Sequence, residues 1–360
     1  MNKDNTPFMN MLESVLVNVW GGNSEQLTKT QLINTRKALS EIRKIYRLRG
    51  EDGTPQPSRI NFKFKKNRAG YLAAFGEAHA YLSFLHLKNV FSKRPEAIPT
   101  PKGKHNELVI TSLGAGACVE LYGICLYYSQ YAQRHLRIIL NTVEKERAWT
   151  PNRQLVFVKV LKKAFPKIEI DPVEIGVDLR KDTIPELARY YDSLANTDIL
   201  IIYNVLNEIP VTYTKYVWKN IKFLIDNFKK DVLILIMEPS AGRAEPRIYN
   251  IEEKLIYESD LISSSKEETF TFEASPVCIA MNPSEDNLNY RLFGLRIDGE
   301  KPNFYNKIKR NHLSCIKKSK SVISPEQIWL QLSLLGRKRG RKGKFLPKDM
   351  KNTQQYTLNL

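Results

Sequence analysis

Residues 107–123 read Glu-Leu-Val-Ile-Thr-Ser-Leu-Gly-Ala-Gly-Ala-Cys-Val-Glu-Leu-Tyr-Gly, and this stretch decides the fold that the sequence predicts. It begins with an apolar run from Leu108 to Ile110, turns through Gly114-Ala115-Gly116 and continues as an amphipathic stretch from Val119 to Tyr131. In α/β sheets, a strand, a small-residue turn and a helix in this order present backbone N–H groups to a nucleotide-like ligand. We therefore expect a ligand-binding turn at one edge of an α/β sheet.

The sequence after residue 105 alternates apolar runs with helical patterns, which is typical of a parallel sheet. Strands are expected at 108–113, 137–143, 168–177, 198–203 and 232–237, with helices near 119–131, 151–164, 184–194 and 213–229. A helix near 249–259 then precedes two β-prone runs, Glu268–Ala280 and Tyr290–Ile297. The expected fold class is therefore α/β, with a mostly parallel sheet and an antiparallel closing pair.

The first 100 residues have a different character, because they are helical in pattern, basic and aromatic. Helices are expected over 7–22, from about 24 to 49 and over 69–91. The alternating basic and aromatic run Arg59–Arg68 fits either an edge strand or a basic loop, and the Pro-rich connector 95–103 ends this part. We predict three parts, namely a helical basic N-terminal domain (1–100), the sheet domain (101–300) and a basic C-terminal extension (301–360).

The net charge of +18 is unevenly placed along the chain. Residues 1–105 carry 18 basic and 8 acidic side chains, net +10, and residues 301–360 carry 15 and 2, net +13, which leaves residues 106–300 near −5. Basic flanks around a mildly acidic centre favour a polyanionic partner, and we expect RNA held by the N-terminal helices and the 337–348 tail. The alternative is a Lys-rich sequence whose lysines only decorate a solvated surface.

Several other classes of protein have little support in the sequence. No apolar run approaches the ~20 residues needed to span a bilayer, and the N-terminus lacks the apolar segment of a secretory signal. The cysteines form no CxxC pair and the five histidines are scattered, so neither a disulfide framework nor a metal site is expected. We therefore expect a cytoplasmic protein without a membrane association or a metal ion.

Polar residues follow the predicted strands at their carboxyl ends, where ligands bind in such sheets. Glu144 follows the second strand, Asp178 follows the third, and Asn204 follows the fourth. Each has an ordinary structural interpretation, as a surface acid, a turn former and a cap respectively. Taken with the Gly turn, the three residues favour a bound nucleoside-type cofactor.

These features together resemble a class I S-adenosylmethionine-dependent methyltransferase over about residues 105–298. The resemblance rests on the Gly turn, the polar strand ends, Met237-Glu238-Pro239 after the fifth strand and the closing antiparallel pair. It implies a Rossmann-like fold and S-adenosylmethionine as the cofactor. The usual turn of the family is acidic-x-Gly-x-Gly-x-Gly, and this chain departs from it with Ser112 at the acidic position and Cys118 at the third glycine.

The resemblance also implies roles for individual residues. Glu144 would accept from the ribose hydroxyls, Asp178 from the adenine amino group with Leu179 packed beside the ring, and Asn204 would line the floor near the transferred methyl group. The implied cofactor-binding residues are Ser112, Gly114, Ala115, Gly116, Glu144, Asp178, Leu179 and Asn204.

Catalysis of methyl transfer needs little from the protein, because the sulfonium already activates the methyl group and alignment of the acceptor supplies most of the rest. Asn204 and Glu208 are the predicted catalytic residues. Glu208 would act as a general base where the acceptor atom carries a proton of high pKa, and Glu238 is a second candidate for that role. Both glutamates have a structural alternative, as a helix cap for Glu208 and a supporting carboxylate for Glu238.

Three segments in succession are similar to RNA methyltransferases, including ribosomal-RNA uridine methyltransferases: Ser112–Gly116, Glu120–Gly123 and Glu144–Trp149. The turn Asn204–Glu208 also resembles methyltransferase-like proteins of the small ribosomal subunit, whose cysteine cluster is missing here. The expected function is methyl transfer to RNA, with ribosomal RNA as one case. Two alternatives remain open: a non-catalytic RNA- or ribosome-binding protein on a degenerate methyltransferase fold, and a small-molecule or protein methyltransferase.

Overall fold

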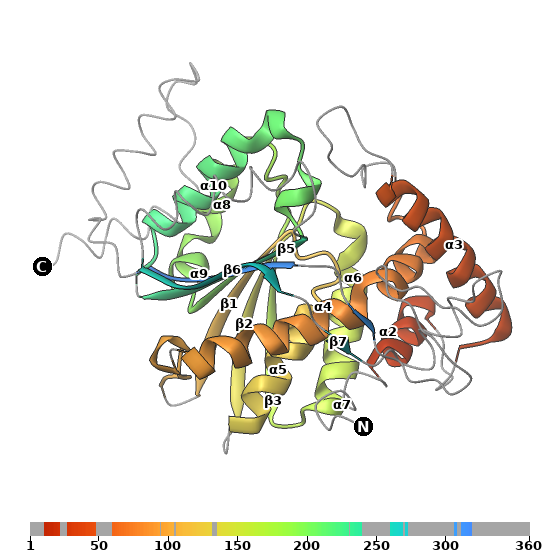
Figure 1. The fold of residues 1–360 in the computed structure, drawn as a ribbon, viewed down its shortest axis with the longest axis horizontal. Coiled ribbons are helices and arrows are strands. Elements are labelled where there is room, and N and C mark those ends of the chain that lie inside the picture. The colour runs from red at the N-terminus through yellow and green to blue at the C-terminus, as the bar shows by residue number, and fades with distance from the viewer. Residues whose placement is uncertain are drawn as a thin grey trace, which may run out of the picture.

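A computed structural model describes residues 11–21, 27–47, 60–93, 95–103, 106–131, 135–229, 231–239, 260–268, 271–272, 306–307 and 311–318. Three predicted segments lie outside these residues: the helix near 249–259, the β-prone run 290–297 and the basic tail 337–348. The described elements form a central twisted sheet with helices on both of its faces (Figure 1).

Seven strands form the central sheet in the order β3-β2-β1-β4-β5-β9-β6. Their bounds are Glu107–Leu113 for β1, Leu136–Val143 for β2, Ile168–Ile175 for β3, Ile199–Tyr203 for β4, Val232–Pro239 for β5, Asp260–Glu268 for β6 and Asn311–Lys318 for β9. Strands β1 to β5 are parallel, whereas β9 pairs antiparallel with both β5 and β6. Two short strands, β7 (Thr271–Phe272) and β8 (Asn306–Lys307), pair with each other. The predicted α/β class, with its closing antiparallel pair, is confirmed.

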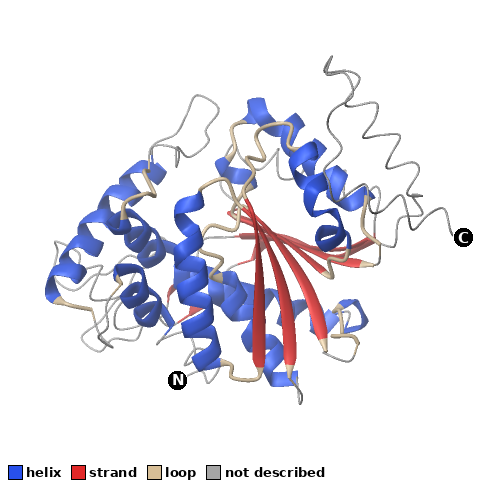
Figure 2. Ribbon diagram, turned by 180° about the vertical axis from the view of Figure 1, so that it is seen from behind, coloured by secondary structure: helices blue, strands red, loops and turns tan. Residues whose placement is uncertain are grey.

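Helices cover both faces of this sheet (Figure 2). One face carries α2 (Met11–Trp20), α4 (Lys65–Lys93), α5 (Glu120–Tyr131), α6 (Thr150–Val156) and α7 (Lys162–Ala164), with α3 (Lys29–Arg47) packed on α4. The opposite face carries α8 (Ile184–Leu187), α9 (Tyr191–Ala195) and α10 (Thr214–Asp226). Short turns of 3₁₀-helix connect several elements, namely η2 (Pro95–Ala97), η3 (Arg147–Trp149), η5 (Ala188–Tyr190), η6 (Leu206–Glu208) and η7 (Val211–Tyr213).

The central strands are apolar on both faces because helices cover both. In β4, Ile199 and Ile201 pack on the side of α4 and α5, whereas Leu200 and Ile202 pack on the side of α10. A strand covered on both sides reads as a continuous apolar run, which is why β1, β4 and β5 were predictable. Strand β3 lies at the edge, is half-exposed and contains Pro172, a residue that an edge strand tolerates.

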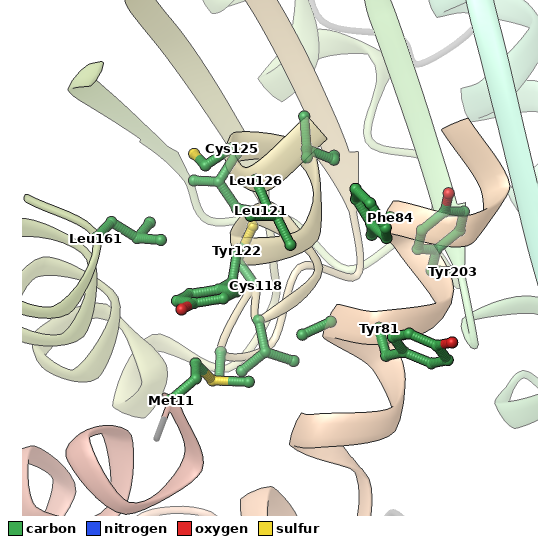
Figure 3. Close-up of a cluster of buried hydrophobic side chains, with 14 of the residues drawn as sticks. Met11, Tyr81, Phe84, Cys118, Leu121, Tyr122, Cys125, Leu126, Leu161 and Tyr203 are labelled. Carbon is green, nitrogen blue, oxygen red and sulfur yellow. The ribbon is translucent and has the colours of Figure 1, made fainter. Parts of the chain in front are cut away.

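The N-terminal helices pack on the sheet domain through a close crossing of α4 and α5. A Cβ at Gly123 would overlap the carbonyl oxygen of Ala80 and the hydroxyl of Ser83, so glycine alone permits this approach. Ser83 Oγ lies 2.7 Å from the carbonyl oxygen of Glu120 and donates to it. Figure 3 shows the result, one buried cluster that runs from α2 and α4 through α5. The domain boundary at residue 100 stays a prediction, because the N-terminal helices and the sheet share this cluster.

The structure differs from the sequence-based expectation in three places. The antiparallel strands beside β5 are 260–268 and 311–318, so β9 lies within the region expected as the basic extension. Of the two runs expected to form this pair, 290–297 and most of 268–280 lie outside the described residues. Strand β9 reads Asn-His-Leu-Ser-Cys-Ile-Lys-Lys, and so polar a run gives little strand signal. The end of the basic and aromatic run Arg59–Arg68 forms the first turn of α4, whereas an edge strand or a loop was expected. A π-helical turn (η4, Phe157–Leu161) interrupts the helix expected over 151–164.

Candidate cofactor site

The carboxyl ends of β2, β1 and β4 bring three predicted site segments together. Strand β1 pairs with β2 as far as Leu113 opposite Val143, and with β4 as far as Leu113 opposite Ile202. Since β1 lies between the other two strands, the turn that follows it is flanked by Glu144 on one side and Asn204 on the other. The structure therefore supports the expectation that these strand ends share one edge of the sheet.

The turn after β1 needs glycine at its first position. Gly114 has a φ of +60°, and a Cβ there would lie 2.5 Å from Cγ2 of Val205. Gly116 has a φ of +49° but has no heavy atom nearer than 3.9 Å to the place of a Cβ. Cys118 also adopts a positive φ, +56°, which is strained for a residue with a side chain. The turn thus places three left-handed residues within five, with open space at Gly116.

Glu144 is bound to the turn that it was predicted to serve. Its Oε2 accepts from the backbone N–H of Gly116 at 2.9 Å, and its Oε1 accepts from the N–H of Glu146 at 2.8 Å. A carboxylate has about four lone-pair sites, so two remain for hydroxyl donors on a ligand. The carboxylate is therefore fixed in position and still able to accept.

Four of the five N–H groups from Gly114 to Cys118 have acceptors within the protein. Those of Gly114 and Ala115 donate to the carbonyl oxygen of the last residue of β2, at 2.8 and 3.4 Å, and that of Cys118 donates to the carbonyl oxygen of Ala115. The N–H of Gly116 donates to the carboxylate described above. For the N–H of Ala117, no acceptor exists among the residues that the structure describes. Ala117 is 5% exposed, and an N–H in such a residue is rarely left without an acceptor, so this N–H is a candidate donor to a ligand.

A buried arginine fixes the peptide that carries this N–H. Arg153 of α6 donates from Nη1 to the carbonyl oxygen of Gly116. Its Nε and Nη2 bind both carboxylate oxygens of Glu174 on β3, and Nη2 also donates to Thr150 Oγ1 at 3.1 Å. A trans peptide directs its C=O and its N–H to opposite sides. Because the Gly116 carbonyl points at Arg153, the N–H of Ala117 points away from it.

Ser112 lies in β1, just before the turn, and its side chain is hydrogen-bonded to the carboxyl group of Glu120. Ser112 is buried, and its Oγ donates to Oε1 of Glu120 at 3.1 Å. Burial raises the pKa of Glu120 to about 7, against hydrogen bonds from Ser112 and Cys118 and the charge of Arg153, which lower it. Burial also raises the pKa of the Cys118 thiol, so this cysteine is an uncharged packing residue. The role of Ser112 in cofactor binding stays a prediction, since its hydroxyl has an internal partner.

Asp178 reaches the same edge but is bound by its own neighbour. The backbone N–H and the guanidinium of Arg180 contact both carboxylate oxygens, with Nη2 2.6 Å from Oδ2. Burial would raise the pKa of Asp178, yet the hydrogen bonds and charge of Arg180 hold it below its usual value. Leu179 is buried, and its carbonyl oxygen accepts from Nδ2 of Asn220 at 3.0 Å. The adenine contacts of Asp178 and Leu179 stay predictions, and Asp178 would have to share donors with Arg180.

Asn204 combines a left-handed backbone with a buried side-chain donor that has no acceptor in the described part of the chain. Its φ is +55°, its backbone N–H donates to the carbonyl oxygen of Met237 at 2.8 Å, and its Nδ2 is buried without an acceptor in the described part of the chain. Asn adopts a left-handed backbone more readily than most residues, whereas a buried donor without an acceptor calls for an explanation, which a ligand acceptor would supply. Glu208 is half-buried in η6, with its N–H bound to the carbonyl oxygen of Val205 at 3.2 Å. The catalytic roles of Asn204 and Glu208 stay predictions.

The structure thus adds residues that sequence reasoning missed, chiefly Arg153, Glu120 and the N–H of Ala117. A polar residue in a helical pattern was the available signal for Arg153, and it is too common to single out one residue. Among the described residues, no group of His, Cys, Asp or Glu side chains could hold a metal ion. None of the described helices is long and apolar enough to cross a membrane.

Comparison with known proteins gives a likeness in fold. No protein-family model matches this sequence, and no curated protein matches it either. Among solved structures, the chain is similar to a protein from Listeria monocytogenes assigned to the class I S-adenosylmethionine-dependent methyltransferases, with 8% identity, a TM-score of 0.35 and 90% of this chain and 91% of that chain covered.

Two further structures show the range of these likenesses. A protein from Clostridium thermocellum assigned as an rRNA methylase has 8% identity and a TM-score of 0.32, with 69% of this chain and 97% of that chain covered. The CMeT domain of the citrinin polyketide synthase has 8% identity and a TM-score of 0.33, with 89% and 91% covered. The predicted Rossmann-like fold rests on the strand order itself.

Proposed function

We propose that this protein is an S-adenosylmethionine-dependent methyltransferase that transfers a methyl group to RNA. The observation that carries the proposal is the unsatisfied pair of donors at the strand ends, the N–H of Ala117 and the Nδ2 of Asn204. Ala117 belongs to the Gly turn, in which the N–H groups of the four neighbouring residues, Gly114, Ala115, Gly116 and Cys118, have acceptors within the protein, and Asn204 flanks this turn. A site built this way needs a ligand with acceptors at two places and hydroxyls for Glu144.

S-adenosylmethionine fits this set of groups. Its ribose hydroxyls would donate to the free lone pairs of Glu144, and its amino-acid carboxylate is an acceptor for the N–H of Ala117. The open space at Gly116 allows the backbone to approach the ligand closely. When bound, the cofactor supplies an activated methyl group on a sulfonium centre.

The residues of the chain would then hold the reactants in line. The Glu144 carboxylate, fixed by two backbone N–H groups, would orient the ribose, and Asn204 Nδ2 would donate to an acceptor atom near the methyl group. Glu208 lies four residues after Asn204 and would take a proton from the acceptor atom where one must leave. Alignment of this kind accounts for most of the rate in such transfers.

RNA is the acceptor class that the charge distribution favours. The chain carries a net charge of +18, concentrated in residues 1–105 and 301–360. In the described part, α3 presents Lys29, Arg36, Lys37 and Lys44 on its exposed surface. Backbone phosphates bind such surfaces without sequence preference, and the basic flanks would hold the strand while the sheet edge presents the methyl donor.

Calorimetry with S-adenosylmethionine tests the cofactor, and transfer of a tritiated methyl group tests the acceptor. Purified protein is offered total RNA, total protein and a metabolite pool in separate reactions, and label is expected in RNA. If no heat of binding is detected at millimolar concentrations of the cofactor, the proposal that the protein is a methyltransferase is refuted. Label found only in protein or in metabolites would refute the RNA acceptor but keep methyl transfer.

A second function, RNA binding without catalysis, is favoured by one observation. Ser112 replaces the acidic residue of the family turn, and its hydroxyl is bound to Glu120 and directed into the protein. A protein that no longer bound the cofactor could keep this internal hydrogen bond between Ser112 and Glu120. The donors at Ala117 and Asn204 would then have no acceptor, which favours the enzyme. The calorimetry described above separates the two functions, because only the enzyme requires the cofactor to bind.

A further inference from the structure

One exposed aromatic side chain lies within a basic segment at the start of α4. Residues 60–68 contain four basic side chains and no acidic one. Phe64 is 56% exposed, the largest exposure among the described large apolar side chains, and Lys63, Lys65 and Lys66 around it are also exposed. An isolated exposed aromatic is common, but one flanked by three cations resembles a surface for a strand with stacking bases and phosphates.

The neighbouring aromatic residues are not available for the same role. Phe62 lies with its ring centroid 5.1 Å from that of Trp149 and 5.5 Å from that of Tyr71. Tyr71 in turn lies 5.7 Å from Trp149 and 5.0 Å from Phe75. These rings pack on one another within the protein, so Phe64 is the aromatic residue of this segment that remains for a ligand.

The backbone holds Phe64 in a defined position. The N–H of Phe64 donates to the carbonyl oxygen of Asn61 at 3.3 Å, and the Asn61 side chain accepts from the N–H of Lys63 at 3.0 Å. The guanidinium of Arg68, which is buried, donates to the carbonyl oxygens of Phe62 and Lys63. Because these hydrogen bonds already order the backbone at Phe64, stacking of a base on its ring costs little backbone entropy.

This segment is also joined to the edge of the sheet that carries the candidate cofactor site. Trp149, against which Phe62 packs, ends the η3 turn that begins three residues after Glu144. The buried part of the segment therefore contacts the loop whose first residue, Glu144, binds the Gly turn. A strand bound at Phe64 would pass near the loop that positions the methyl donor.

We propose that Lys63–Lys66 is a docking element for an unpaired RNA strand, with Phe64 stacking on a base and Lys63, Lys65 and Lys66 contacting phosphates. The inference rests on the proposed RNA acceptor and names the surface that receives it. Unpaired RNA fits better than a duplex, because a base must leave its stack to lie on an aromatic ring. An acidic protein segment would need no stacking residue at the centre of the lysines.

The test measures binding of a fluorescein-labelled single-stranded RNA of mixed sequence by anisotropy, with the full chain. Phe64→Ala is expected to weaken binding roughly 5- to 150-fold, as loss of one stacked base does. Phe64→Trp should restore it, since a larger ring stacks at least as well. Replacement of Lys63, Lys65 and Lys66 by Ala should reduce the slope of log affinity against log salt by roughly two, for three phosphate contacts to a single strand.

Matched controls lie on other parts of the molecule. Tyr190 is a similarly exposed aromatic at 36%, on the opposite face of the sheet, and Lys162 and Lys163 are exposed on α7. Tyr190→Ala and the double change of the two lysines to Ala should leave both affinity and salt slope unchanged. When the same variants are titrated with single-stranded DNA and with duplex RNA, we expect the duplex to bind more weakly than either single strand.

Two results would overturn the inference: unchanged affinity for RNA in Phe64→Ala, or equal loss in Tyr190→Ala. Equal dependence on Phe64 for duplex and single-stranded RNA would refute the stacking. Calorimetry with S-adenosylmethionine on the same variants keeps the two proposals apart, because Phe64→Ala should bind the cofactor as the parent protein does. If RNA binding depends on Phe64 but the protein does not bind the cofactor, the docking surface is supported and the proposed methyltransferase activity is refuted.

Discussion

Arg153 donates to the carbonyl oxygen of Gly116, so a buried side chain of α6 sets the orientation of one peptide in the turn after β1. The guanidinium is 2% exposed, and Glu174 of β3 holds it from the other side. The same peptide directs the N–H of Ala117 to the opposite side, where it has no acceptor in the described part of the protein. The ion pair between Arg153 and Glu174 therefore connects the edge strand β3 to the candidate cofactor site. Variants of this pair can distinguish an effect on stability from an effect on cofactor binding.

Arg153→Met is expected to lower the free energy of unfolding by about 3–5 kcal/mol, because it leaves the partly buried Glu174 without its cation. Arg153→Met combined with Glu174→Leu should recover most of that loss, since an apolar pair of similar volume often replaces an ion pair well. The double variant should nevertheless bind S-adenosylmethionine about tenfold more weakly, because the Gly116 peptide is no longer held. Urea unfolding measures the first effect and calorimetry the second. Parental cofactor affinity in the stable double variant would show that Arg153 is purely structural.

Glu144→Ala should weaken S-adenosylmethionine binding by roughly 1–3 kcal/mol, because the ribose hydroxyls lose an acceptor and the N–H of Gly116 loses its partner. Glu144→Gln keeps one acceptor oxygen and should fall between the parent protein and the Ala variant. Glu169→Gln, at an exposed position of β3, is the matched control and should have no effect. The measurement is calorimetric titration at constant pH. An unchanged affinity in Glu144→Ala would place the ribose elsewhere.

Gly114→Ala and Gly116→Ala distinguish the cost of a steric overlap from the cost of a left-handed backbone at a residue with a side chain. Both glycines have positive φ, so a side chain costs ~1–2 kcal/mol at either position. At Gly114 the new methyl group would also overlap Val205, which adds about 1–3 kcal/mol, whereas the place of a Cβ at Gly116 is open. Urea unfolding should therefore rank Gly114→Ala as the less stable variant. Val205→Ala in the Gly114→Ala background should return part of the loss, and no recovery would contradict the predicted overlap.

The turn could be predicted from the sequence because its signals are local. An apolar run, two glycines two residues apart and an amphipathic stretch follow one another within 25 residues, and Glu144 stands directly after the next apolar run. Strands β1, β4 and β5 were predictable for the same reason, since burial on both faces leaves continuous apolar runs.

The residues that complete the site could not be predicted because their partners are remote. Arg153 meets Gly116 across 37 positions and Glu174 across 21, and its own neighbourhood reads as an ordinary polar helix. Asp178 shows the converse: its place at a strand end was predictable, but its binding to Arg180 depends on the conformation of a turn that the residue types alone do not specify. The polar strand β9 was missed because its pairing with β5 depends on residues about 80 positions away.

Glu120 should make the stability of the protein depend on pH. Its pKa in the folded protein is about 7, raised by burial from an ordinary 4.5, so between those values the folded state binds more protons than the unfolded state. The free energy of unfolding should therefore fall as pH rises through this window, by up to ~1.4 kcal/mol per pH unit from this group. Glu120→Gln removes the titrating group, and its stability relative to the parent protein should improve steadily from pH 5 to pH 7 and then level off. Urea unfolding of both proteins at half-unit steps measures that difference, with Glu41→Gln on the exposed face of α3 as the control. A difference that does not change with pH would mean that Glu120 ionises in the folded protein as it does in water, and that Ser112 faces a charged carboxylate.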